Sequence, residues 1–199
     1  MKKVLVAGIL AAGFSATASA LPVINGSFET GDFTGWDVTT SAGGSAIVDT
    51  FDAGFTATDG NYFANLTANS LVSQNQSWSS GTTLTFDWNF NSNDYLPYND
   101  YSLLVIKDSG GSIIDNITLA NVASAGNFAA TGWNTYTYTF TGNGSGSIGF
   151  GVYNAIDNGL DSQLYLDNVY ASAVPEPASL AILGLGLAGL GFARRSQKK

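Results

Sequence analysis

The 199-residue sequence contains neither cysteine nor histidine, and only seven of its residues are lysine or arginine. These absences exclude a Ser–His or Cys–His nucleophile, a disulfide framework and a thiolate metal site. Zinc, copper and haem iron also lose their usual protein ligands. What remains is the chemistry of carboxylates, hard cations and neutral ligands, or a purely structural role.

The few basic residues are confined almost entirely to the two ends of the chain. Between residues 21 and 174, fourteen acidic residues stand against one basic residue, Lys107, which gives this stretch a net charge of −13 (1 − 14). The whole chain carries only −8. A surface of this charge repels phosphate backbones, so we expect no nucleic-acid partner.

Residues 1–20 have the three zones of a secretory signal peptide. The positive start Met1-Lys2-Lys3 is followed by an apolar run and by the small residues Ala18-Ser19-Ala20. The apolar run is shorter than the ~20 residues that a membrane span needs. We therefore expect signal peptidase to remove this segment, so that the mature chain begins at Leu21; a short N-terminal anchor is the alternative.

The C-terminal segment combines a proline motif, an uncharged apolar stretch and a basic tail. Two prolines fix the start of a helix near Ala178, and the basic cluster favours retention of its end on the cytoplasmic side. We expect a single transmembrane helix over residues 178–193. The residues that define the motif are Pro175, Glu176, Pro177, Arg194 and Arg195.

This order of Pro-Glu-Pro, apolar helix and arginine-rich end resembles the PEP-CTERM sorting signal of Gram-negative bacteria, and the resemblance covers residues 174–199. It implies that an exosortase recognises and processes a precursor that the helix holds transiently in the inner membrane. Because the family is associated with exopolysaccharide production, the resemblance also implies a final location at the cell surface or in the extracellular matrix of a biofilm. An ordinary membrane anchor is the alternative, although it needs no Pro-Glu-Pro.

Residues 21–173 are typical of an all-β domain. Residues 83–90 alternate between an apolar face that contains Leu84, Phe86 and Trp88 and a polar face, as a strand with one buried side does. Gly/Asn/Asp turns separate the candidate strands. Nine or ten short strands at this spacing predict an antiparallel two-sheet sandwich, most simply a jelly roll. The remaining candidate strands are 46–51, 62–67, 71–76, 101–107, 113–119, 134–140, 146–153 and 164–171.

Three short patches resemble galactose-binding-like jelly rolls, a group that includes several carbohydrate-binding modules. They are an opening at 25–36, a turn at 59–62 and a closing strand at 164–169. In such modules a Glu of the opening and an Asp of the closing strand help to ligate a structural Ca²⁺. The resemblance therefore implies Glu29 and Asp167 as metal ligands, and oxygen ligands suit a hard cation. No other cofactor is expected; the alternative is that both are surface or turn residues.

The segment 93–101 concentrates aromatic, amide and acidic side chains between two strands. Sugars stack their C–H faces on aromatic rings while amides and carboxylates bind their hydroxyls, so these residue types suit a carbohydrate ligand. The alternative is that the tyrosines pack against the edge of the sandwich. The candidate ligand-binding residues are Tyr95, Tyr98, Asn99, Asp100 and Tyr101.

These observations predict an exported, exosortase-processed protein of the cell surface or extracellular matrix, serving as a non-catalytic structural component of exopolysaccharide or biofilm. The alternative is a carbohydrate-binding module for an extracellular polysaccharide, either dependent on calcium or independent of it. Enzymatic activity is not expected, because glycoside hydrolysis needs a facing pair of carboxylates across a cleft and no such pair stands out.

Overall fold

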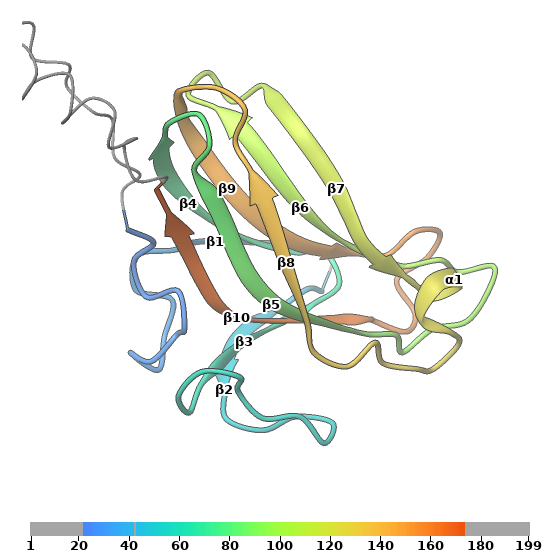
Figure 1. The fold of residues 1–199 in the computed structure, drawn as a ribbon. Coiled ribbons are helices and arrows are strands. Elements are labelled where there is room, and N and C mark those ends of the chain that lie inside the picture. The colour runs from blue at the N-terminus through green and yellow to red at the C-terminus, as the bar shows by residue number, and fades with distance from the viewer. Residues whose placement is uncertain (1–21, 42, 174–199) are drawn as a thin grey trace, which may run out of the picture.

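The computed structural model describes residues 22–41 and 43–173, which form two stacked antiparallel β-sheets of five strands each (Figure 1). The first sheet has the order β1-β4-β9-β6-β7 and the second the order β2-β3-β10-β5-β8. This arrangement confirms the predicted all-β, two-sheet sandwich. The predicted signal peptide, its cleavage point and the C-terminal helix lie outside the described residues.

The strands follow the alternation of the sequence closely, and the only helix of the described part is one short turn. The strands are β1 (Asp37–Thr40), β2 (Ala46–Asp49), β3 (Phe63–Thr67), β4 (Ser70–Trp78), β5 (Thr83–Asn91), β6 (Tyr101–Asp108), β7 (Ile113–Asn121), β8 (Asn134–Thr139), β9 (Gly144–Tyr153) and β10 (Gln163–Ser172), and the helix is α1 (Val122–Ala125). Within residues 22–41 and 43–173, no helix combines the length and the apolar character needed to cross a membrane.

The core lies between the two sheets and is rich in aromatic residues. The predicted apolar face of β5 is buried there, and Phe86 packs edge-to-face on Phe150 of the opposite sheet, with ring centroids 4.7 Å apart. Burying one such side chain stabilises the fold by about 1.5–3 kcal/mol. Apolar contacts between the two sheets therefore stabilise the sandwich, and its loops extend from this packed core.

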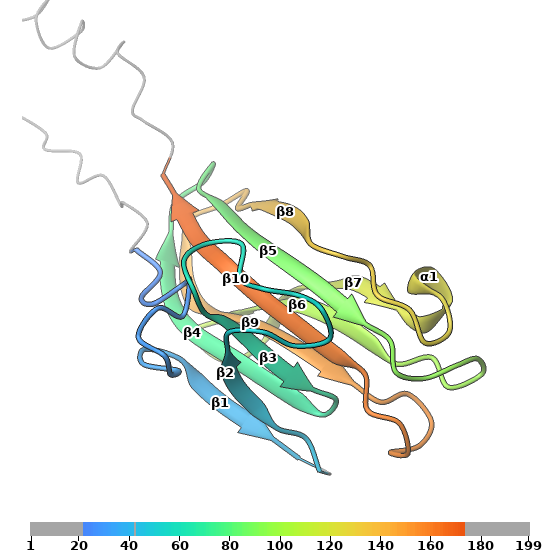
Figure 2. The same ribbon diagram turned by 90° about the horizontal axis from the view of Figure 1, so that it is seen from below.

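The segment between β2 and β3, residues 50–62, crosses the outer face of the second sheet (Figure 2). We call this segment the strap. Its Asp52 accepts a hydrogen bond from Tyr165 of β10, and its Thr58 donates one to Asp87 of β5. With this cover, the middle of the polar face of β5 is buried as well as its apolar face: Asp87 is buried and Asn89 has no exposed surface.

Both ends of the described chain, blue and red in Figures 1 and 2, lie at one end of the sandwich. Val23 and Ala171, near the start and the finish, line the same small cavity. We call this the terminal end. The opposite end carries α1 and the connections 92–100, 126–133 and 154–162, and we call it the loop end.

Candidate functional site

The three connections of the loop end are joined to one another by hydrogen bonds. Asn93 Nδ2 donates to the carbonyl of Asp161 at 2.9 Å, and the backbone N–H of Phe128 donates to the carbonyl of Asp94 at 3.0 Å. Each bond links loops that are far apart in sequence. The loop end is consequently one connected surface rather than three independent loops.

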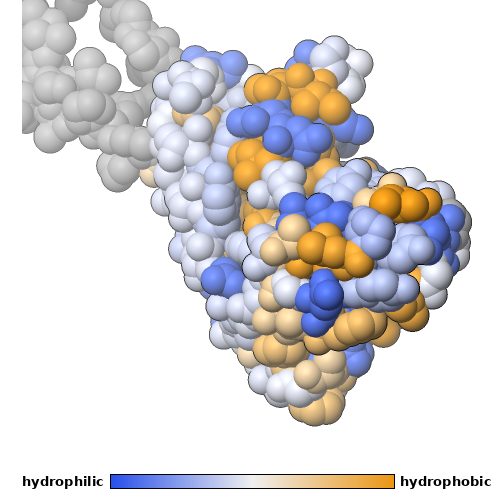
Figure 3. Space-filling model, turned by 90° about the vertical axis from the view of Figure 1, so that its right-hand side faces the viewer, coloured by the Kyte–Doolittle hydropathy of each residue, from blue (hydrophilic) through white to orange (hydrophobic). Residues whose placement is uncertain are grey.

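Three aromatic side chains gather on this surface, and we call Tyr95, Tyr98 and Phe128 the aromatic cluster. Tyr95 contacts Tyr98 edge-to-face with ring centroids 5.4 Å apart, and it lies 5.7 Å from Phe128 at an interplanar angle of 33°. The cluster is open to solvent, because Tyr95 is 39% and Phe128 63% exposed. Figure 3 faces this end and shows hydrophobic areas interleaved with hydrophilic ones.

The structure divides the five predicted ligand-binding residues into two groups. Tyr95, which is exposed, and Tyr98, which is half-buried, belong to the aromatic cluster, whereas Asn99, Asp100 and Tyr101 contact other parts of the protein. Asn99 Oδ1 accepts a hydrogen bond from the backbone of Ala123 at 2.8 Å, and Tyr101 stacks on Tyr153 with ring centroids 5.7 Å apart. These last residues position the loop on the sandwich.

Asp100 is buried, and its carboxylate links two loops through hydrogen bonds. Its carboxylate accepts hydrogen bonds from the Oγ of Ser162 at 2.8 Å and from the backbone N–H of Ala155 at 3.2 Å. Burial raises the pKa of Asp100 above its ordinary value, and these hydrogen bonds offset part of that rise, while the charge of Asp94 adds to it. The contacts of Asp100 tie the segment 154–162 to the loop that carries Tyr95 and Tyr98.

Phe128 is the member of the cluster that the sequence did not indicate. It lies thirty-three positions beyond Tyr95 in the chain, outside any strand. Its φ of 52° is in the left-handed region, which is unfavourable for a bulky residue. An aromatic residue beside Gly126 and Asn127 in a loop was the available signal, but its proximity to Tyr95 arises only from the fold.

A second polar site lies under the strap and is filled by the protein itself. Asp52 Oδ2 accepts hydrogen bonds from Asn65 Nδ2 at 3.0 Å, Gln163 Nε2 at 3.0 Å and the Tyr165 hydroxyl at 2.8 Å. Burial and the contact with Asp52 raise the pKa of Tyr165 far above its ordinary value. Because the strap supplies the carboxylate for all three donors, this cluster fixes the strap to the sheet.

The predicted metal ligands Glu29 and Asp167 both accept hydrogen bonds from the backbone of one turn, residues 58–62. Glu29 Oε1 accepts the backbone N–H groups of Asn61 and Tyr62, both at 2.8 Å, and Asp167 Oδ2 accepts those of Thr58 and Asp59 at 2.7 and 2.9 Å. Burial raises the pKa of Asp167. In the described residues, no group of three or more acidic side chains is arranged to hold a metal ion. The Ca²⁺ site stays a prediction.

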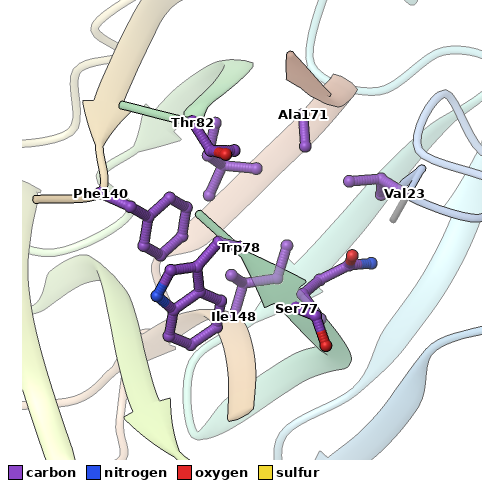
Figure 4. A pocket seen from close by; sticks show the side chains of 9 residues that line it. Val23, Ser77, Trp78, Thr82, Phe140, Ile148 and Ala171 are labelled. Atoms are coloured by element: carbon purple, nitrogen blue, oxygen red, sulfur yellow. The ribbon is translucent and has the colours of Figure 1, made fainter. Parts of the chain in front are cut away.

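The terminal end offers less for a ligand to contact. Figure 4 shows the cavity between Val23, Trp78 and Phe140, which has a volume of only about 10 Å³ and is apolar. An open hollow of about 480 Å³ lies beside it and includes Tyr138. In this hollow Trp78 and Phe140 are stacked on each other and buried, so their ring faces are not available for stacking.

Comparisons with known proteins bear on the tail and on the sandwich. Residues 173–195 match the PEP-CTERM protein-sorting motif, which confirms the resemblance expected from Pro175, Glu176, Pro177, Arg194 and Arg195. The motif indicates an exported, membrane-anchored precursor processed by exosortase. These five residues lie outside the described part of the structure. No curated protein sequence matches the chain.

The sandwich is similar to solved structures of low sequence identity. TmCBM61 in complex with β-1,4-galactotriose has a TM-score of 0.53 at 18% identity, covering 75% of this chain and 96% of that one. The K2 cleaved adhesin domain of Lys-gingipain has a TM-score of 0.52 at 14% identity, covering 79% of this chain and 100% of that one. The K1 cleaved adhesin domain of Lys-gingipain from Porphyromonas gingivalis W83 has a TM-score of 0.51 at 14% identity, with the same two coverages. These likenesses show the jelly-roll fold that carbohydrate-binding modules share.

Proposed function

We propose that this protein is an exported surface protein whose sandwich binds extracellular polysaccharide without catalysis. The observation that carries the proposal is the aromatic cluster on a connected loop surface, in which Tyr95 and Phe128 are exposed and Tyr98 is half-buried. The protein would thereby be a non-catalytic component of exopolysaccharide or biofilm, which joins the two functions expected from the sequence.

The chemistry of the cluster supports a sugar ligand. The parts of these rings that face solvent are hydrated in the isolated protein, whereas the C–H face of a sugar ring removes their surface from water. Three rings supplied by two loops offer contacts to successive sugar units of a chain. Amide groups nearby, including that of Asn127, whose Oδ1 accepts the backbone N–H of Leu96 at 3.2 Å, are available to bind hydroxyl groups.

The position of the cluster also supports a surface role. The chain enters and leaves the sandwich at the terminal end, and the sorting motif follows immediately after β10. The cluster lies at the opposite end (Figure 1). A ligand at the loop end therefore approaches the molecule away from the segment on which the sorting machinery acts.

The test is polysaccharide binding by the purified protein and by matched variants. Wild-type protein is applied to a glycan array and to gels that contain soluble polysaccharides, beside Phe128→Ala, Tyr95→Ala and the control Phe51→Ala. Phe51 is as exposed as Phe128 but belongs to the strap. Loss of a ring should weaken binding about tenfold or more, and Phe51→Ala should leave it unchanged.

Two results would overturn the proposal. One is the absence of specific binding by the wild-type protein at high concentration. The other is undiminished binding by Phe128→Ala and Tyr95→Ala, which would place the ligand elsewhere. Thermal unfolding of each variant shows that it is folded, and the exposure of both rings leads us to expect melting temperatures close to that of the wild type.

A further inference from the structure

Charge is distributed unevenly along the sandwich. Lys107, the one basic residue between positions 21 and 174, lies near the end of β6, where it pairs with Ser147 and Ile113 beside the turn 108–112. That position is toward the terminal end. The loop end carries four carboxylates and no lysine or arginine; they are Asp94, Asp100, Asp157 and Asp161.

Two of these carboxylates are buried in the loop that carries Tyr95 and Tyr98. Asp94 is 2% exposed; its Oδ1 accepts the backbone N–H of Tyr95 at 2.7 Å, and its carbonyl accepts that of Phe128 at 3.0 Å. Asp100 is 1% exposed and ties the same loop to residues 155 and 162. The loop that carries Tyr95 and Tyr98 therefore contains two buried carboxylates, and that of Asp94 is bonded to the backbone of Tyr95.

The other two carboxylates lie on the neighbouring connection, residues 154–162. Asp157 is exposed, and its Oδ1 accepts the backbone N–H of Gly159 at 3.1 Å. Asp161 accepts the Nδ2 of Asn154 at 2.8 Å, and its carbonyl accepts the side chain of Asn93 from the cluster's own loop. The bond to Asn93 ties Asp161 to the loop that carries Tyr95 and Tyr98, and Asp157 lies four residues before Asp161 on the same connection.

Aromatic rings backed by carboxylates attract cations for two separate reasons. The faces of tyrosine and phenylalanine rings attract an ammonium group through the ring quadrupole. Buried carboxylates act through a medium of lower dielectric constant than water, so their attraction is screened less than that of surface charges. The same carboxylates repel an anionic chain such as a polyuronate. A neutral chain is neither attracted nor repelled by them.

We propose that the aromatic cluster selects a cationic polysaccharide, namely a polymer of amino sugars whose amino groups are free and carry positive charge. This inference rests on the proposed function and gives its ligand class. The sugar rings stack on Tyr95, Tyr98 and Phe128, and the ammonium groups are held by the field of the four carboxylates of the loop end.

The test compares oligosaccharides that differ only in charge. Calorimetric titrations use a β-1,4-linked glucosamine hexamer, its fully N-acetylated counterpart and a hexamer of galacturonate, at about 50 mM and about 500 mM NaCl. The free-amine hexamer should bind about tenfold more tightly than the acetylated one at low salt, and the difference should shrink at high salt. The galacturonate hexamer should bind most weakly.

Variants separate the proposed site from diffuse attraction to an acidic protein. Phe128→Ala leaves the net charge unchanged and should abolish most binding of the free-amine hexamer. The double variant D157N/D161N should weaken that binding about fivefold and leave the acetylated hexamer unaffected, since asparagine keeps the accepting oxygen of each residue. The matched control Asp37→Asn removes an exposed charge from β1 and should have little effect.

Each outcome decides between the two proposals. Equal or tighter binding of the acetylated or galacturonate hexamer would overturn the cationic preference while leaving polysaccharide binding intact. Binding of the free-amine hexamer that survives Phe128→Ala would show general charge attraction and would also overturn it. Failure of every oligosaccharide and polysaccharide to bind would overturn the proposed function itself.

Discussion

Glu29 and Asp167, from opposite ends of the described chain, fasten the two sides of a single turn. Glu29 accepts the backbone N–H groups of Asn61 and Tyr62, and Asp167 accepts those of Thr58 and Asp59. The turn is the last part of the strap. The two carboxylates therefore join the opening segment, the strap and β10, which makes this turn a sensitive place to measure stability.

Calcium should stabilise the protein if the resemblance to calcium-bearing modules extends to these carboxylates. A carboxylate has about four acceptor positions, so hydrogen bonds from the turn leave room for a cation. We predict a higher melting temperature in Ca²⁺ than in chelator, because an ion that binds only the folded state stabilises it. Glu29→Gln should remove the increase. Identical melting curves in Ca²⁺ and EDTA would show that the two residues serve only as hydrogen-bond acceptors.

Gly60 should be hard to replace because its missing side chain makes room for Glu29. A Cβ at position 60 would lie 2.3 Å from the Glu29 carboxyl carbon. Gly54, also in the strap, has a similar positive φ but nothing within 4 Å of an added Cβ, and it is the matched control. Both alanine variants share the cost of a left-handed backbone, about 1 kcal/mol. Gly60→Ala should lose about 1–3 kcal/mol more in chemical unfolding; equal losses would contradict the steric argument.

Tyr165→Phe should loosen the strap. The change removes the hydroxyl that donates to Asp52 at 2.8 Å and accepts from Asn91 at 3.2 Å. We expect the free energy of unfolding to fall by about 1–2 kcal/mol. Hydrogen exchange at residues 50–58 should become faster. Tyr170→Phe, on the same strand but exposed, is the control and should change neither quantity.

Mild acid should stabilise the protein. Burial raises the pKa of Asp100 and of Asp167 above the ordinary 3.8, so the folded state binds protons more readily than the unfolded chain. Their contribution to the free energy of unfolding therefore increases as pH falls from neutral towards 3.8. Hydrogen bonds from Thr30 and Thr34 lower the pKa of Asp32. The stability that Asp32 contributes is therefore lost on acidification, but only below about pH 4.

Urea unfolding at pH 7 and at about pH 5 measures this effect. The transition midpoint should move to higher urea at the lower pH. Asp100→Asn should make the shift smaller, because the variant no longer titrates at that position. A midpoint that falls on acidification in the wild-type protein would contradict the assignment.

The strands were predictable because their signal is local. The alternation in residues 83–90 and 134–140 places apolar side chains on one face whatever the rest of the chain does, and the structure has strands at both places. β1 (Asp37–Thr40) was not predicted, since all four of its residues are exposed and carry no apolar alternation. The sequence features that define a buried strand are absent there.

The arrangement of the site depends on contacts that no local pattern contains. Asp87 and Asn89 lie on the polar face of β5 and read as solvent-facing, yet both are buried because the strap and Trp133 cover that face. Likewise Tyr95 was predicted as a ligand-binding residue, but Phe128 reaches it through hydrogen bonds between their two loops, such as that between Phe128 and Asp94. Such pairings come from the tertiary fold alone.

Because the two chain ends lie close together, the sandwich is suited to insertion into another protein as a domain. Since Val23 and Ala171 border one small cavity, the domain can be inserted into a surface loop of a host protein without stretching either junction. In copies joined in series, every junction would lie at the terminal end of a domain, and every aromatic cluster would lie at the end away from the junctions. An array of this kind would turn many weak sugar contacts into strong attachment through multivalency.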